Sequence, residues 1–424
     1  MAAVRGEALA VEGFRTEPVE AAHRWALRLI LLQAMGITTS TMSLLGLAQG
    51  SGLLRLFCLV TAFALLLRRD SHIYPPPLTL IAYALLMVVT ADLSATLGAP
   101  YVELGLLVAT IAVYVTLAKR VPVNAFLAAF RDVVVAASLL SLVIYFGGLQ
   151  PAEFVGRYAP NIFGAPPLSG LFPHKIEAGV IAVLAAIALA TVPYRRASRT
   201  LMALALLATI LLLSGSGSGM LLAGVAAAML FVARFRPGTR LLMIVSAALL
   251  AGVLALVAGD AALGAAGSLT GRSETLTGRT DLWRTALNLF SEKPIFGWGY
   301  GSLFGDTGLL ARNGMATGGA NYVAPHFHNS YLQSLAESGV LGMGMLLLLA
   351  VTITNRLVHR DRHGALLALW VTVAIYATAN HAFHPTQLGW LIICYASAVP
   401  LKAHTDLRQP VVGQMQALAN VTGR

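Results

Sequence analysis

The stretch Leu201-Met-Ala-Leu-Ala-Leu-Leu-Ala-Thr-Ile-Leu-Leu-Leu213 carries no charge, and its single polar side chain is a threonine. Residues 241–258 and 342–352 are uncharged as well. Such runs approach the roughly 20 apolar residues with which a helix crosses a lipid bilayer. They predict an integral membrane protein built from helices.

The amino-acid composition points the same way. Of the 424 residues, 57% are hydrophobic and only 11% are charged, and the mean hydropathy is +0.76. A soluble domain carries roughly a quarter charged residues, so this chain has more apolar surface than a soluble fold can bury. Cys58 and Cys394 both fall inside apolar runs, and therefore neither a disulfide framework nor a cysteine metal site is expected.

Apolar runs between charge clusters predict an all-α, polytopic protein of about twelve transmembrane helices. The predicted spans are residues 25–48, 53–67, 78–97, 101–118, 132–149, 176–193, 200–213, 217–233, 241–258, 334–354, 365–382 and 388–401. Residues 1–24 and 402–424 then form cytoplasmic segments. The first nine helices occupy 25–258 with an outer loop at 150–175, a large outer loop occupies 259–333, and three helices follow at 334–401.

Basic residues give the orientation. Most of the 29 lysines and arginines lie in segment 1–24, in the connections after the even-numbered spans and in the tail 402–424. The positive-inside rule therefore places both termini in the cytoplasm. A net charge of +11 would suggest a nucleic-acid partner for a soluble chain, but here it is a topology signal, and no nucleic acid is expected.

Almost all the remaining basic residues lie in the two long outer loops, against the insertion bias. They are Arg157, Lys175, Arg272, Arg279, Arg284, Lys293 and Arg312. An anionic ligand on the outer side is a physical reason to keep them, since arginine forks suit phosphate or diphosphate. Binding of lipid headgroups is the alternative.

The large loop contains a predicted amphipathic helix at residues 281–292, with Thr280 as its N-cap and Pro294 as its stop. Leu282, Trp283, Ala286, Leu287 and Phe290 form its apolar face. Such a helix either packs on the bundle or gates a site at the membrane surface. The following stretch 296–301 offers Trp298 and Tyr300, whose rings suit either sugar stacking or the membrane interface.

The stretch Pro325-His-Phe-His-Asn-Ser-Tyr-Leu-Gln333 leads into the tenth span. His326 and His328 are candidate proton acceptors at the mouth of the bundle, although a loop histidine is often only a solvated or capping residue. Histidines two residues apart can bind a metal, but no cluster of carboxylates or cysteines completes a shell, so no metal is expected. Glu337 is costly inside a span unless it binds a loop arginine or helps to bind substrate.

Three stretches carry a resemblance to a known family: residues 170–175, residues 278–301 and residues 328–339. Their sequences are GLFPHK, GRTDLW continuing to PIFGWGYG, and HNSYLQSLAESG. With them the chain resembles the O-antigen ligase and polymerase-like membrane proteins, which include polymerases of exopolysaccharide assembly. The twelve-span layout is similar as well.

The resemblance implies a GT-C-like fold and an inverting glycosyltransferase without metal or cofactor, in the bacterial inner membrane. The donor would be a glycan on undecaprenyl diphosphate, bound at the periplasmic face. Arg279 would hold the diphosphate, His328 would be the base and Lys175 a further contact. Two departures are Gly217, where many relatives have a basic residue, and Ile176, where exopolysaccharide polymerases often have asparagine. We expect Arg272 or Arg284 to replace the charge missing at Gly217.

Several alternatives stay open. The enzyme is a polymerase if the acceptor is another lipid-linked repeat, and a ligase if the acceptor is lipid A core. A protein acceptor is a third and less favoured alternative. Residues 172–175 favour the polymerase. Membrane lipids and polysaccharide export proteins are the other expected partners. A twelve-helix secondary transporter is the rival from another class, although no related halves are visible. A non-catalytic assembly partner is a third reading.

Overall fold

The computed structural model describes residues 19–47, 51–68, 71–93, 100–150, 160–248, 279–304, 308–312, 326–361 and 364–401. In this part of the chain every regular element is a helix and none is a strand, as the apolar runs predict. Residues 1–18 of the predicted N-terminal segment, residues 249–278 with Arg272, and the predicted tail 402–424 lie outside the described residues.

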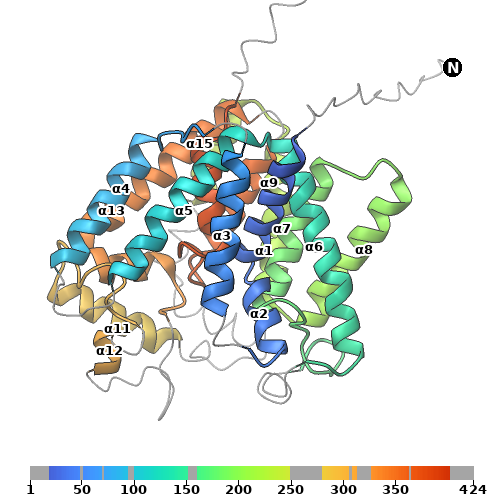
Figure 1. Ribbon diagram of the computed structural model, residues 1–424, viewed down its shortest axis with the longest axis horizontal. Helices are drawn as coiled ribbons and strands as arrows, with labels where there is room; N and C mark the ends of the chain where they lie inside the picture. Colours follow the sequence, from blue (N-terminus) through green and yellow to red (C-terminus); the bar gives the residue numbers. More distant parts are fainter. Residues whose placement is uncertain are drawn as a thin grey trace, which may run out of the picture.

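The helices stand side by side in a bundle (Figure 1). In chain order they are α1 (Ala21–Ala34), α2 (Ile37–Leu44), α3 (Ser51–Leu67), α4 (Leu78–Leu93), α5 (Pro100–Arg120), α6 (Val123–Phe146), α7 (Lys175–Thr191), α8 (Ala197–Ser214), α9 (Gly217–Val232), α11 (Arg279–Glu292), α12 (Leu309–Arg312), α13 (Ser330–Arg360), α14 (Ala365–Tyr376) and α15 (Leu388–Ala398). Residues 237–248 are helical too.

Four helices are long and apolar enough to cross a membrane: Tyr101–Arg120, Val123–Phe146, Ala197–Ser214 and Ser330–Arg360. Shorter apolar helices lie at Gly52–Leu67, Leu78–Asp92, Gly217–Val232, Ala365–Tyr376 and Leu388–Ala398. Helices thus coincide with most of the predicted spans. The number of crossings, twelve, stays a prediction.

Two stretches form helices whose bounds differ from those of the predicted spans. Residues 25–48 form two helices instead of one, because Gly36 adopts φ 70° and ends the hydrogen-bonded ladder between α1 and α2. The helix that contains most of the predicted span 132–149 is α6, which begins at Val123 and runs through Arg131. The buried guanidinium of Arg131 lies inside the bundle, where it pairs with Asp132 at 2.8 Å and donates to the carbonyl of Val192.

α7 is the central helix of the part of the bundle that holds α6, α8 and α9 (Figure 1). It is buried along almost its whole length, which explains why its sequence is apolar on every side. Small residues bring α9 close to it: a Cβ added at Gly179 would lie 2.5 Å from Cβ of Ser216. The Ser216 hydroxyl is 3.4 Å from the carbonyl of Ile176. The turn before α9 therefore touches the first turn of α7.

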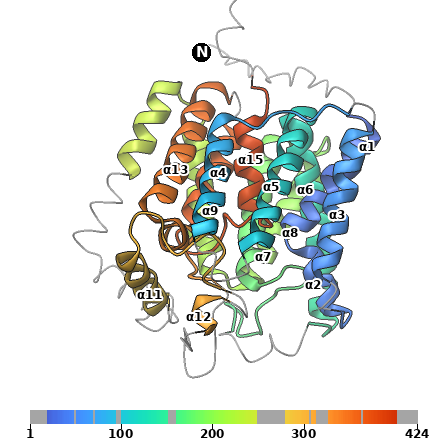
Figure 2. The same cartoon turned by 60° about the vertical axis from the view of Figure 1, so that its left-hand side comes forward.

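α11 and α12 lie at one end of the bundle, below α13 and α4 (Figure 2). The amphipathic helix is confirmed, but two details of it were wrong. It already includes Arg279, so Thr280 is not its N-cap. Its buried face consists of Leu282, Ala286 and Leu289, while Leu287 is 49% exposed, because the true stripe follows the i, i+4, i+7 spacing.

Candidate active site

The start of α13 is shaped by a break at Gly339, which has φ 63° and ψ −162°. The glycine-rich segment before α12 enters this break. The backbone N–H of Trp298 donates to Ala336 O at 3.0 Å, Gly299 N to Glu337 O at 2.8 Å, and Val340 N to Pro294 O at 2.8 Å. We call residues 294–299 the clasp. It fixes the first turns of α13 relative to α11.

The loop that carries His328 is pinned on both sides. Asn329 caps α13, because its Oδ1 accepts from the N–H groups of Tyr331 and Leu332 at 3.0 Å. Phe327 is fully buried, its N–H donates to Gln333 Oε1 at 3.2 Å, and its carbonyl accepts from Trp283 Nε1 at 3.1 Å. His328 itself has φ 53°, the only positive φ among described non-glycine residues. Strain of this kind is concentrated at functional sites.

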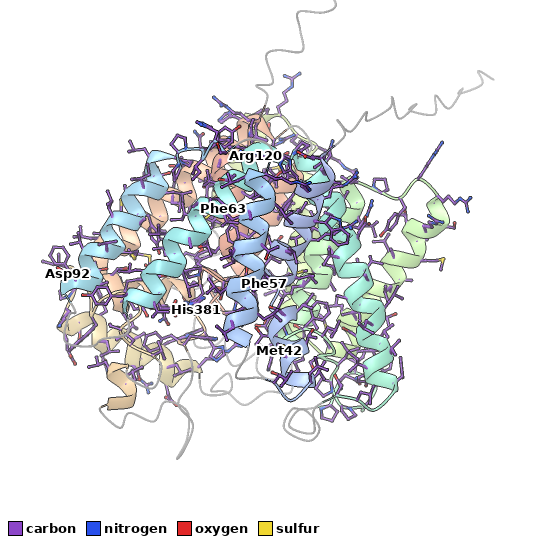
Figure 3. All side chains as sticks on the ribbon, in the orientation of Figure 1. Met42, Phe57, Phe63, Asp92, Arg120 and His381 are labelled. Carbon is purple, nitrogen blue, oxygen red and sulfur yellow. The ribbon has the colours of Figure 1, made fainter. Side chains whose placement is uncertain are left out.

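Four histidines follow one another from this loop into the bundle. The ring centroids of His328 and His326 are 4.2 Å apart, those of His326 and His381 5.2 Å, and those of His381 and His384 5.2 Å. The row ends on Glu103, whose Oε2 is 2.9 Å from Nε2 of His384. Figure 3 shows His381 in the half of the bundle nearer α11.

The first turn of α7 belongs to the same region. His174 is its N-cap, and its Nδ1 accepts from the N–H of Ile176 at 3.1 Å. Burial, together with the charges of Lys175, His328 and Arg279, lowers the pKa of His174 to about 4. Lys175 is buried, at 7% exposure. The fold therefore brings His328, Arg279 and Lys175 within electrostatic reach of one imidazole.

The loop histidines are uncharged near neutral pH. Burial lowers the pKa of His328 to about 4, with the charge of Arg279 as the second cause. Burial, together with the charges of His328, His384 and Arg279, lowers the pKa of His326 to about 3. We call His174, His326 and His328 the neutral histidines. An imidazole in this state has a free lone pair and can accept a proton.

A cavity of about 570 Å³ adjoins the histidine row. Three of the predicted site residues line it: His326, Tyr300 and Glu337. Glu337 is 6% exposed and accepts a hydrogen bond from Gln333 Nε2, one turn earlier on α13. Its partner is thus an amide, and not the loop arginine that its position in a span suggested.

Two other predicted residues point elsewhere. Arg284 lies on the outer face of α11, where its side chain is 74% exposed and pairs with Asp281 at 3.2 Å. Trp298 packs under α11: its Nε1 donates to Leu289 O at 2.9 Å, and Lys293 Nζ sits 4.0 Å from its ring centroid. The structure does not place either one on the cavity.

Some residues of the site were missed by sequence reasoning. Glu103 and Arg55 line the cavity from α5 and α3, and Asn380 donates to Glu177 Oε1 at 3.3 Å beside α7. The signal for Glu103 was available, since it is an acidic residue in the first turn of an apolar helix. Asp92, at the end of α4, is also an acidic residue of an apolar helix, but it is exposed at the edge of the bundle (Figure 3).

Comparison with known proteins agrees with the resemblance seen in the sequence. Residues 202–347 match the family model described as O-antigen ligase. The matched region runs from α8 to the middle of α13 and includes Arg279, the clasp and His328. A search of curated proteins found no match.

Proposed function

We propose that the chain is a membrane glycosyltransferase of the O-antigen ligase and polymerase-like kind, as the family match over residues 202–347 supports, and that it transfers a glycan from undecaprenyl diphosphate to a sugar hydroxyl. The reaction takes place at the periplasmic face of the bacterial inner membrane. The observation that supports this most is the convergence of a neutral histidine, His328, with two cations, Arg279 and Lys175.

His328 acts as the general base. It takes the proton from the acceptor hydroxyl while the acceptor oxygen bonds to the anomeric carbon and the bond from that carbon to the diphosphate oxygen breaks. The configuration at the anomeric carbon inverts in this single displacement. General-base catalysis of this kind contributes roughly two to four decades in rate. No metal or other cofactor is required, because the diphosphate is already an activated leaving group.

Arg279 and Lys175 stabilise the charge that grows on the departing diphosphate. Lys175 is the first residue of α7, whose N-terminus adds its own partial positive charge. The turn that holds Gly217 lies against this first turn of α7 through Ser216 and Ile176. Lys175 is therefore the residue that supplies the charge absent at Gly217, while Arg284 is turned to solvent.

The orientation follows from the charges. Arg120 lies at the opposite end of the bundle from α11 and α12 (Figure 3), and it belongs to a connection that the positive-inside rule assigns to the cytoplasm. The site then faces the periplasm, with both termini in the cytoplasm and twelve crossings in a GT-C-like arrangement. The polymerase reaction, with a second lipid-linked repeat as acceptor, is our first choice, and a ligase acting on lipid A core is the second.

The test is to incubate the purified protein with a lipid-diphosphate-linked repeat unit, with and without lipid A core, and to separate the products on a gel. We expect a ladder of longer glycans without lipid A core. The variant His328→Asn should slow it about 100- to 10,000-fold while the protein still folds, because asparagine tolerates positive φ. Unchanged product length in this variant would refute the mechanism. Substrate-driven transport in proteoliposomes without any product would favour the transporter.

A further inference from the structure

The cavity beside the histidine row has features that the transfer chemistry alone does not require. It is enclosed by α3, α4, α5, α13 and the loop after α14, and His326 separates it from His328. Its volume of about 570 Å³ lies in the range of small-molecule sites, roughly 300–1,000 Å³. Arg279 and Lys175 do not line it.

Two tyrosine hydroxyls in this cavity have no protein partner. Tyr83 is only 6% exposed, and Tyr300 lines the same cavity from the segment after the clasp. Among the residues that the structure describes, none lies within hydrogen-bonding distance of either hydroxyl. Both hydroxyls therefore remain available to a ligand or to water in the cavity. The rings of both tyrosines and of Phe304 add flat apolar surface to the same cavity.

The charges in the cavity are balanced. Arg55 donates from Nε to Thr39 Oγ1 at 2.7 Å, and Glu103 is held by His384 at 2.9 Å. His384 is fixed from its other side, because its Nδ1 lies 2.9 Å from Thr386 Oγ1. A ligand with a negative charge would face two carboxyl groups, those of Glu103 and Glu337, against a single arginine among the lining residues, Arg55, which makes its burial unfavourable.

We propose that this cavity binds one or two uncharged sugar residues of the acceptor saccharide. Hydroxyl groups, which both donate and accept, match the tyrosine hydroxyls and carboxyl oxygens, and the C–H faces of a sugar match the aromatic rings. A lipid tail would leave the same polar groups unsatisfied.

The assignment to the acceptor, rather than to the donor, rests on the proposed function. In an inverting displacement the acceptor oxygen and the leaving diphosphate lie on opposite sides of the anomeric carbon. The charge of Arg279 lowers the pKa of His326 and His328, whereas the causes that lower the pKa of His381 are burial and the other histidines. Arg279 is thus at the His328 end of the row and the cavity at the His381 end, with the base between them.

The experiment measures disaccharide binding to the full-length protein in lipid nanodiscs by saturation-transfer NMR. The probes are cellobiose, lactose and chitobiose as neutral sugars and digalacturonate as the anionic one. We expect at least one neutral probe to bind, with digalacturonate at least tenfold weaker. Tyr83→Phe and Tyr300→Phe should each weaken the neutral probe about three- to tenfold, the loss expected for one hydrogen bond.

Tyr331→Phe is the matched control, because the Tyr331 hydroxyl already donates to the carbonyl of Ala374 at 3.0 Å. It should leave binding unchanged. The proposal is overturned if no neutral probe binds or if digalacturonate binds as tightly as the neutral probe. It is also overturned if neither Tyr83→Phe nor Tyr300→Phe weakens the binding of the neutral probe. Transfer activity is read separately. Sugar binding without transfer activity would refute the proposed function alone. Transfer activity together with unchanged sugar binding in both Tyr→Phe variants would refute the sugar site alone.

Discussion

Replacing Gly339 by alanine should open the clasp. A non-glycine residue at φ 63° and ψ −162° costs about 1–3 kcal/mol. The new Cβ would also overlap the carbonyl of Ile295 and lie 2.7 Å from that of Pro294, so residues 294–295 must move. This movement loses the hydrogen bonds from Val340 to Pro294 and from Leu341 to Ile295, each worth about 1 kcal/mol. The total loss of unfolding free energy is about 3–5 kcal/mol.

The assay is chemical denaturation of the purified protein in mild detergent, followed by tryptophan fluorescence, since Trp298 lies in the clasp. Gly344→Ala is the control in the same helix. A Cβ added at Gly344 meets nothing within 4 Å, and alanine there should stabilise the helix by up to about 1 kcal/mol. If Gly339→Ala is as stable as the wild type, the break in α13 is not fixed by the clasp and the reasoning fails.

Three further predictions concern the site. Arg279→Gln should lower transfer about ten- to hundredfold, the value of a charged hydrogen bond, whereas Arg284→Gln on the same helix should not; equal effects would contradict the assignment. Lys175→Gln should also lower the transfer rate, and adding Gly217→Arg to this variant should restore part of that rate, as measured by the product ladder. If the second substitution restores nothing, positions 175 and 217 do not supply the same charge. Folding lowers the pKa values of the neutral histidines to about 3–4, from about 6.5 in the unfolded chain. As the pH falls, the unfolded chain therefore binds protons before the folded protein does, and the free energy of unfolding should decrease between about pH 6.5 and 4. An unchanged melting temperature over this range would refute the burial of these histidines in the uncharged form.

The break in α13 shows why part of the site escaped prediction. The motif at residues 328–339 is contiguous, so the sequence is enough to find His328, Glu337 and the helix start. The role of the glycines in residues 294–301 is different. Gly297 is needed both for its positive φ of 68° and because the backbone of α13, far away in the sequence, passes close by. A Cβ at Gly297 would lie 2.5 Å from the carbonyl carbon of Glu337. Sequence reasoning explained the same stretch by its aromatic rings.

The arginines of α11 illustrate the same limit. Arg279 and Arg284 are both basic residues of one outer segment, and composition cannot rank them. The buried stripe of Leu282, Ala286 and Leu289 decides the rotation of the helix, and this rotation turns Arg284 to solvent. In the sequence, the resemblance to the family, and not the helix pattern, favoured Arg279 over Arg284 as the residue that holds the diphosphate.

What the sequence determined by itself is everything that depends on local order along the chain: the apolar runs that became helices, the charge bias that predicts their orientation, and the motif that contains the base. The cavity depends on pairs such as Glu103 with His384 and Arg55 with Thr39, which come from different helices and loops. Their positions follow from helix packing, which sums many weak contacts over the whole bundle. Only the tertiary structure could therefore decide that a cavity lies beside the four histidines and that Arg279 and Lys175 do not line it.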